Sequence, residues 1–344
     1  MCFPRMTLEM VMEVHVQAHD YFSGLPQKGI YDNLKTVVQD ILKGKNRVYN
    51  KRFELLYSHY LFEPIACTPR SGWEKGQVEK QVQDLRNTIF NKNCSYASFE
   101  HLNNCIKTSI NNYTLIHKHP EFDKTIYEAF KEEQAYLCIT NQKFEACVLE
   151  ERIVTKECLV QYDRNYYSVP CEYANKNVTV KIYAFKISIA FEGKEIASHK
   201  RMFGRKYYSC DPYHYLPLLK RKPGAIRNGK PFIEWDLSSN IKKIWSKLIT
   251  IQGGDRQLAT ILNEIPIHGI ELVDEACGES LKNNIITDVF IVNYLNRKST
   301  TKEHTIVTPP EILKIETQPT SDTSIYNIML GGNTSVTARD SQPA

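Results

Sequence analysis

The segment Gly29-Ile30-Tyr31-Asp32 has the pattern of a short apolar strand that ends in a carboxylate. Before it, apolar side chains recur at helical spacing over residues 8–22, and Thr7 can cap the helix that this spacing predicts. After it, a second amphipathic helix is predicted at residues 53–60 and an extended segment at residues 62–69. The order helix, strand, helix, strand predicts an α/β domain.

A third amphipathic helix is predicted after the second strand. Its apolar stripe consists of Val78, Val82, Leu85 and Ile89. The opposite face then carries Glu79, Gln83 and Arg86 at helical spacing. Asp32 at a strand end and Glu79 on this helix would converge at one sheet edge, and two-metal phosphodiester chemistry gathers carboxylates in this way. Taken alone, the pair is a weak signal, because most Asp and Glu side chains are merely solvated and most such pairings are accidental.

The remaining chain shows two changes of pattern. Residues 98–136 have the spacing of two helices, and from residue 152 the apolar period falls to two, with turn signals at residues 162–165 and 192–195. Helical spacing returns at residues 239–248, 269–282 and 288–297, and Asp255 can cap a further helix. The parts predicted are an α/β domain at 1–92, a helical connector at 93–148, a small β-barrel with a basic loop at 149–231, a C-terminal helical region at 232–298 and a disordered tail at 299–344. The tail prediction rests on 18 Ser, Thr or Pro in 46 residues.

The composition excludes several classes of protein. The 344 residues are 42% hydrophobic and 24% charged, which is ordinary for a globular protein. The closest pair among the ten cysteines, Cys138 and Cys147, is nine residues apart, so reduced thiols are favoured over a zinc site or a disulfide framework. With no apolar signal segment or spanning run, we expect a cytoplasmic protein without membrane contact. No Walker-type loop is present, so the chain is not expected to bind ATP itself.

Basic residues concentrate in two stretches, residues 35–52 and 200–231. The second holds nine basic residues and one acid, a local excess of +8 that exceeds the +5 of the whole chain, and tyrosines are interleaved with the cations. A charge run is often only a solvated face, but this excess favours contact with DNA phosphates. The candidate DNA-binding cations are Lys35, Lys75, Arg201, Arg205, Lys206, Lys220, Arg221 and Lys222.

Several motifs in a fixed order carry a family resemblance. They are Tyr31-Asp32-Asn33-Leu34-Lys35-Thr36, His59-Tyr60-Leu61-Phe62-Glu63-Pro64, Glu74-Lys75-Gly76-Gln77-Val78-Glu79, Asn165-Tyr166-Tyr167-Ser168-Val169-Pro170, Ala197-Ser198-His199-Lys200-Arg201 and Gly254-Asp255-Arg256-Gln257. Together they resemble the IstA-type insertion-sequence transposases, a branch of the DDE transposase and retroviral integrase superfamily. The resemblance covers about residues 1–298.

The resemblance implies a ribonuclease-H-like catalytic core in which an Asp, Asp, Glu triad holds two Mg²⁺ ions for DNA cleavage and strand transfer. Asp32 matches the second Asp and Glu79 matches the Glu, while Gln83 and Arg86 fall where integrases contact DNA; for Gln83 a solvated polar face is an equal alternative. The resemblance also implies a helper AAA+ ATPase, a homo-oligomer on DNA and a nucleoid-associated location in the bacterial cytoplasm.

One departure from the family pattern concerns the first Asp, which lies on a strand that precedes the first helix in this fold. Only residues 1–6 precede that helix here. We therefore expect an incomplete ribonuclease-H-like domain, truncated at the N-terminus and inactive alone in strand transfer. Two functions remain open: a DDE transposase polypeptide that requires the missing Asp, and a non-catalytic DNA-binding or assembly module that can interfere with a full-length transposase. An unrelated scaffold would require every motif match to be a coincidence.

Overall fold

The computed structural model describes residues 1–31, 37–41, 47–66, 83, 86 and 95–299. The chain divides into two units, Met1–Leu295 and Asn296–Ala344. The predicted disordered tail lies outside the described residues apart from Ser299, which ends the last helix. None of the described helices is both long and apolar enough to cross a membrane.

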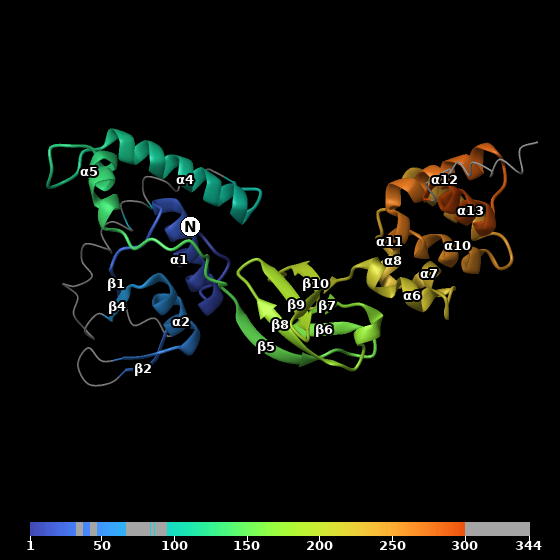
Figure 1. Ribbon diagram of the computed structural model, residues 1–344, viewed down its shortest axis with the longest axis horizontal. Helices are drawn as coiled ribbons and strands as arrows, with labels where there is room; N and C mark the ends of the chain where they lie inside the picture. The colour runs from blue at the N-terminus through green and yellow to red at the C-terminus, as the bar shows by residue number, and fades with distance from the viewer. Residues whose placement is uncertain (32–36, 42–46, 67–82, 84–85, 87–94, 300–344) are drawn as a thin grey trace, which may run out of the picture. The chain divides into compact units, whose positions relative to one another are not determined.

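The N-terminal part alternates helices and short strands, as predicted (Figure 1). Its elements are α1 (Leu8–Phe22), β1 (Lys28–Tyr31), β2 (Val38–Ile41), β3 (Arg47–Tyr49), α2 (Lys51–Tyr60) and β4 (Glu63–Ala66). Strands β1 and β4 pair in parallel, with Lys28 opposite Glu63 and Tyr31 opposite Ala66, whereas β2 and β3 form an antiparallel hairpin. A parallel pair with a helix in the connection is the α/β arrangement, which confirms that class.

The apolar faces of α1 and α2 form the core of this part. Met12 and Val16 from α1 are buried with Phe53, Leu56 and Tyr60 from α2. Helix α1 ends where Ser23 adopts a left-handed conformation at φ 62°, and Leu61 ends α2 in the same way at φ 57°. The spacing of the apolar side chains was therefore sufficient to locate both helices.

The two helices predicted within residues 98–136 are both present. The connector comprises α4 (Phe99–Ile116), α5 (Ile126–Glu133) and the short η2 (Gln134–Tyr136), and Figure 1 shows α5 at a steep angle to α4, near one of its ends. Ser98 caps α4 by accepting a hydrogen bond from the His101 N–H, and Thr125 forms a reciprocal capping box with Glu128. Of the predicted third helix at 78–89, only Gln83 and Arg86 are described, and both are helical and exposed.

The strands after residue 148 do not close into the predicted small barrel in the described part of the chain. They form a four-stranded sheet in the order β10-β9-β8-β5 and a three-stranded sheet in the order β11-β7-β6. The strands are β5 (Val148–Ile153), β6 (Leu159–Tyr162), β7 (Asn165–Ser168), β8 (Asn177–Ile182), β9 (Lys186–Phe191), β10 (Lys194–Lys200) and β11 (Tyr208–Ser209), with η3 (Cys171–Tyr173) between β7 and β8.

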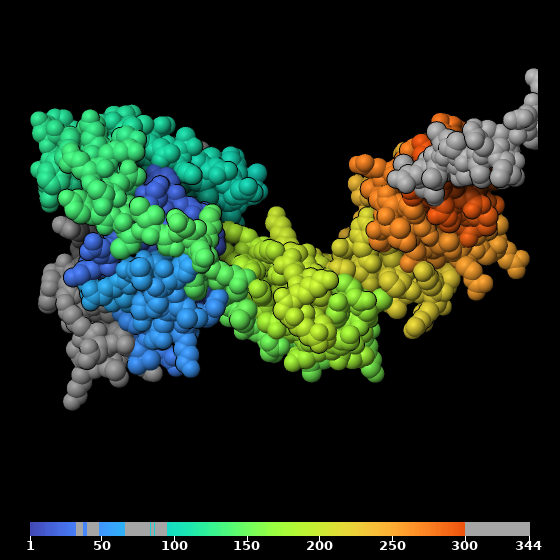
Figure 2. All heavy atoms as spheres, viewed as in Figure 1, coloured from blue at the N-terminus to red at the C-terminus, as the bar shows by residue number. Residues whose placement is uncertain are grey.

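Turns that the alternating pattern concealed explain the difference. The stretch 152–161 reads as one strand, yet a turn that places Cys158 at φ 60° separates β5 from β6. The two sheets nevertheless share one core, in which Val160 and Tyr167 of the smaller sheet are buried with Val180, Ile187 and Ile189 of the larger. Figure 2 shows the yellow-green atoms of this part closely packed.

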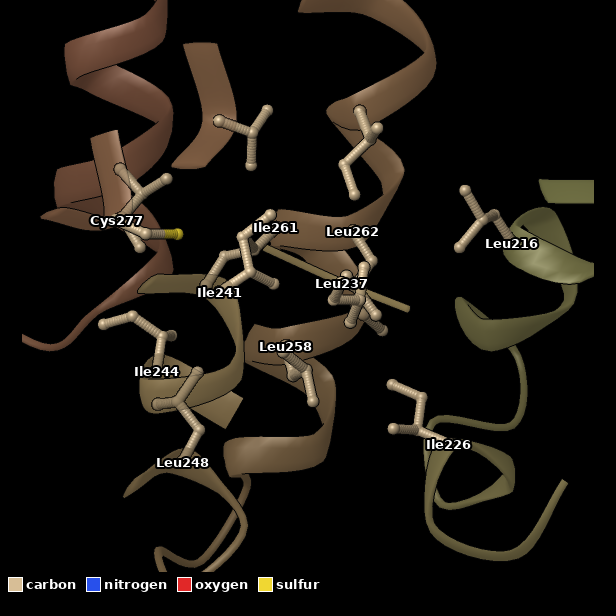
Figure 3. Packing of buried hydrophobic residues seen from close by; sticks show 14 of the residues in the cluster. Leu216, Ile226, Leu237, Ile241, Ile244, Leu248, Leu258, Ile261, Leu262 and Cys277 are labelled. Atoms are coloured by element: carbon tan, nitrogen blue, oxygen red, sulfur yellow. The ribbon is translucent and has the colours of Figure 1, made fainter. Parts of the chain in front are cut away.

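The C-terminal part is helical. Its elements are η4 (Pro212–Tyr215), α6 (Leu216–Leu219), α7 (Ala225–Asn228), α8 (Lys230–Ile233), α9 (Ser239–Leu248), α10 (Gly254–Asn263), α11 (Ile265–His268), α12 (Ile270–Lys282) and α13 (Asp288–Ser299). Figure 3 shows Ile241, Ile244 and Leu248 of α9, which share one buried cluster with Leu258 and Ile261 of α10 and Cys277 of α12. The predicted cap of α10 is wrong, because Gly253 is the N-cap and the Asp255 carboxylate binds the Arg227 guanidinium at 2.9 Å.

Candidate nucleic-acid interface

The loop that joins β10 to β11 carries the exposed cations and aromatic rings of the second basic stretch. We call residues 202–208 the basic-aromatic loop. Arg205, Lys206, Tyr207 and Tyr208 are all exposed, Tyr207 by 59% of its surface. Cations neutralise phosphates and rings stack on bases or sugars, so this is the chemical composition of a DNA contact.

One buried amide holds this loop in place. Asn165, at the start of β7, has no exposed surface, and its side-chain Nδ2 donates to the carbonyl oxygens of Met202 at 3.1 Å and Gly204 at 3.0 Å. Its Oδ1 accepts the Tyr207 N–H at 3.1 Å. A primary amide that donates and accepts at once can bind both sides of a backbone loop. The loop is therefore fixed by its backbone, which leaves the side chains of Arg205, Lys206 and Tyr207 exposed.

The turn before β7 contributes to the same surface. Asp163 and Arg164 connect β6 to β7 with φ 45° and 61°, the backbone of a tight hairpin turn. The Arg164 carbonyl accepts the Lys206 N–H at 2.8 Å, and Arg164 is exposed. The hairpin turn thus places a third exposed cation beside Lys206.

Tyr208 is engaged by neighbouring side chains. Its ring stacks on Tyr166 with centroids 4.7 Å apart and an interplanar angle of 16°, and the Lys230 Nζ lies 3.5 Å from its centroid. A cation over an aromatic face is attracted by the ring quadrupole. Lys230 is therefore fixed at the edge of the candidate interface.

A buried histidine cluster anchors the chain just beyond the loop. Ser168 at the end of β7 accepts the Asp211 N–H at 2.8 Å through its Oγ, which lies 2.8 Å from His214 Nδ1. His199 of β10 has its Nε2 2.6 Å from the Ser168 carbonyl oxygen and its Nδ1 3.0 Å from Ser209 Oγ. Because a carbonyl only accepts, His199 Nε2 carries a proton. The cluster joins three segments that border the loop.

Burial lowers the pKa of both His199 and His214 from the ordinary value of 6.5, although Asp211 raises each of them partly. The folded state therefore takes up protons only below the pH at which the unfolded chain does, and folding stability falls as the pH drops below 6.5. Urea unfolding is expected to show a lower free energy of unfolding at pH 5.5 than at pH 7.5. The substitution His214→Asn is expected to reduce this difference by on the order of 1 kcal/mol. An equal reduction by the exposed His101→Asn would contradict this assignment.

Arg201 occupies an internal position rather than the predicted DNA-binding surface. It is 4% exposed, and its Nη1 donates to Glu9 Oε1 of α1 at 2.7 Å and to the Tyr183 carbonyl at 2.8 Å. The pair spans 192 residues of sequence. Because both charges are buried and satisfied by each other, this geometry favours a structural role for Arg201 over a phosphate contact.

The other predicted DNA-binding cations fall into two groups. Lys220, Arg221 and Lys222, directly after α6, are exposed, as is Arg86. Lys35 and Lys75 lie outside the described residues, and so do the predicted metal ligands Asp32 and Glu79. No relation between these carboxylates and the basic-aromatic loop follows from the described residues.

The strand end that precedes Asp32 is well anchored. Tyr31, the last residue of β1, has its hydroxyl 2.6 Å from His15 Nε2, and its ring centroid lies 5.3 Å from that of Phe53. His15 Nδ1 lies 2.7 Å from the Val11 carbonyl oxygen, which can only accept, so Nε2 accepts the proton of the Tyr31 hydroxyl. Among the described residues no group of three His, Cys, Asp or Glu side chains is arranged to hold a metal ion.

Sequence reasoning missed Asn165, Ser168, His214 and Glu9. The motif Asn165-Tyr166-Tyr167-Ser168 was visible in the sequence, but its polar residues face partners about 40 residues away, which periodicity does not reveal. A polar side chain at an inward strand position was the available signal, because such a group is rarely buried without a partner.

Known proteins resemble both the two-sheet part and the chain as a whole. A family model described as Mu transposase, C-terminal domain, matches residues 139–211, which include Asn165 and the basic-aromatic loop. The chain is 38% identical over 331 residues to a transposase for insertion sequences IS1326/IS1353 from Pseudomonas aeruginosa, covering 93% of this chain and 64% of that protein. Over nearly all of its length the chain is therefore similar to insertion-sequence transposases.

Two further relatives agree. A transposase from Aminobacter aminovorans is 34% identical over 330 residues, covering 94% of this chain and 65% of that protein. A transposase for insertion sequence element IS21 from Pseudomonas aeruginosa is 30% identical over 217 residues, covering 62% of this chain and 55% of that protein. The chain therefore spans slightly less than two thirds of the length of the IS1326/IS1353 transposase and of the Aminobacter aminovorans transposase.

Proposed function

We propose that this chain binds insertion-sequence DNA as a transposase polypeptide, and that the basic-aromatic loop with Lys220, Arg221 and Lys222 forms the DNA-contacting surface. The observation that carries this proposal is the Asn165 clamp, which fixes the loop backbone while Arg205, Lys206 and Tyr207 remain exposed. The Mu transposase C-terminal match over the same residues supports it. A loop built only for solubility would not require a buried amide to hold its shape.

We further propose DDE chemistry for the α/β part, with Asp32 and Glu79 as metal ligands in a ribonuclease-H-like core of IstA type. Carboxylate oxygens suit Mg²⁺, which would activate the attacking oxygen and stabilise the leaving oxygen of the phosphodiester. The parallel β1–β4 pair supports this proposal, because Asp32 directly follows β1 and the segment with Glu79 follows β4 in sequence. We also propose that the chain acts with a helper AAA+ ATPase, that it forms a homo-oligomer on DNA and that it is located at the bacterial nucleoid.

Salt dependence tests the DNA-binding proposal. The affinity of the full chain for a labelled duplex carrying the element end, measured by fluorescence anisotropy, is expected to fall linearly in log K against log salt. Replacing Arg205, Lys206 and Arg221 by glutamine is expected to reduce the slope by about three, since each phosphate contact contributes about 0.9. A flat salt dependence of the wild-type chain would contradict the proposal.

Two controls accompany this measurement. The first replaces Lys107, Lys118 and Lys131 of the connector by glutamine, which removes the same charge from exposed positions elsewhere. A slope change equal to that of the loop variant would show that only net charge matters. The second is Asp32→Asn, which is expected to leave DNA affinity unchanged and to abolish strand transfer in any reaction that the wild-type chain supports.

A non-catalytic role is the second candidate. It is favoured by one observation: the exposed cations and rings of the candidate interface and the Asn165 clamp all come from residues after position 160, outside the α/β part. If a reaction that contains this chain still shows strand transfer and DNA binding after Asp32→Asn, the Asp32 carboxylate is not needed for the chemistry. That result would favour the non-catalytic role over DDE chemistry in this chain.

A further inference from the structure

The two adjacent tyrosines of the basic-aromatic loop have different surroundings. Tyr208 is stacked on Tyr166 and contacted by the Lys230 ammonium. Tyr207 is more exposed, and within the described residues no aromatic ring or cation packs on its ring. An exposed aromatic ring without a partner, beside a ring that has two, indicates a surface available to a ligand.

The Tyr207 ring is nevertheless held in position. It lies against Gly204, where a β-carbon would fall 1.8 Å from its Cε2 and 2.5 Å from its Cδ2. On the backbone, the Tyr207 N–H donates to Asn165 Oδ1 and the Tyr207 carbonyl accepts the Tyr166 N–H at 2.9 Å. The glycine therefore provides the space that the ring occupies, and the side chain is ordered before any ligand arrives.

Positive charge lies directly beside this ring. Arg205 and Lys206 precede it in the loop, and the exposed Arg164 is tied to Lys206 through the backbone. Lys206 adopts a left-handed conformation at φ 60°, so the chain changes direction between Arg205 and Tyr207. A ligand that stacks on Tyr207 would therefore have its negative groups near three cations.

An unpaired nucleotide has the chemistry that fits this arrangement. In a duplex the base faces are covered by neighbouring bases, whereas an unpaired base can stack on a protein ring while its phosphates contact cations. We propose that Tyr207 is a stacking platform for an unpaired base of a DNA strand, so that the interface prefers DNA with a single-stranded end to blunt duplex. This inference rests on the proposed DNA-binding function and specifies its substrate class.

The test compares two probes in the same anisotropy assay: a blunt duplex, and the same duplex with a four-nucleotide single-stranded overhang. The full-length wild-type chain is expected to bind the overhang probe about ten-fold more tightly, the size of one base–aromatic stack. Tyr207→Ala is expected to lower the affinity for the overhang probe about ten-fold more than the affinity for blunt duplex, and to leave the salt slope unchanged because no cation is removed. Tyr207→Phe is expected to keep the preference, because the ring and not the hydroxyl provides the stack.

The exposed Tyr136→Ala in the connector is the matched control and is expected to change neither affinity. Equal binding of both probes by the wild-type chain would overturn the inference, and so would an equal loss on both probes in Tyr207→Ala, since the ring would then pack on the duplex backbone. Both outcomes leave the proposed function intact. That function fails separately, through a flat salt dependence on blunt duplex.

Discussion

Glu9→Ala is expected to lower the free energy of unfolding by about 3 to 5 kcal/mol, the usual loss when one partner of a buried ion pair is removed. Among the described residues, the Arg201 guanidinium would then keep the Tyr183 carbonyl at 2.8 Å and the more distant Tyr162 hydroxyl at 3.4 Å as its polar partners. Arg201 Nε already has no hydrogen-bond partner in the structure. Urea unfolding followed by circular dichroism measures the loss.

The matched control is Glu100→Ala, which removes an exposed glutamate from the first turn of α4, as Glu9 lies in the first turn of α1. It is expected to change stability by less than about 0.5 kcal/mol. The double variant Glu9→Leu with Arg201→Met is expected to be less destabilised than Glu9→Ala, because an apolar pair leaves no buried charge. A loss for Glu9→Ala no larger than that for Glu100→Ala would show that the pair does not persist in solution.

Asn165→Ala is expected to cost about 3 kcal/mol of stability and to weaken DNA binding in the same variant. It leaves the Met202 and Gly204 carbonyls and the Tyr207 N–H without their partner, and an unsatisfied buried polar group costs about 1 to 3 kcal/mol. Because the loop then loses its fixed shape, its cations and rings must be ordered on binding. Urea unfolding and anisotropy with blunt duplex measure the two effects on one preparation.

Asn177→Ala is the control, since Asn177 begins β8 with its side chain exposed. Asn165→Asp is informative as a second variant, because a carboxylate keeps the size of the side chain but cannot donate to the two carbonyls. It is expected to be at least as destabilised as Asn165→Ala. Full DNA affinity in a folded Asn165→Ala chain would mean that the clamp serves stability alone.

Local patterns in the sequence were enough to place most helices. The apolar spacing of α1, α2, α9 and α12 is regular, and Ser98 and Thr125 are typical cap residues, so these elements follow from neighbouring residues alone. The closed barrel was wrong, because alternation does not show where a strand is interrupted. Cys158 in a left-handed turn is a residue type that gives no turn signal.

The candidate site was predicted in its composition but not in its construction. Exposed Arg205 and Lys206 follow from the charge run, whereas the burial of Arg201 in the same run depends on Glu9, far away in sequence. Only the fold brings Arg201 and Glu9 together. The charge of the sequence stretch alone therefore assigned the buried Arg201 and the exposed Arg205 to the same surface. The roles of Asp32, Glu79, Lys35 and Lys75 remain predictions, as do those of Gln83 and the exposed Arg86.

The Glu9–Arg201 pair also has a consequence for synthesis of the chain. At about 5 to 20 residues per second, a ribosome needs roughly 10 to 40 s to make the 192 residues that separate the two partners. During that interval helix α1 has emerged with an acidic side chain whose buried partner, Arg201, does not yet exist. Until β10 is complete, Glu9 therefore lacks its ion-pair partner, although the apolar face of α1 can already pack on α2.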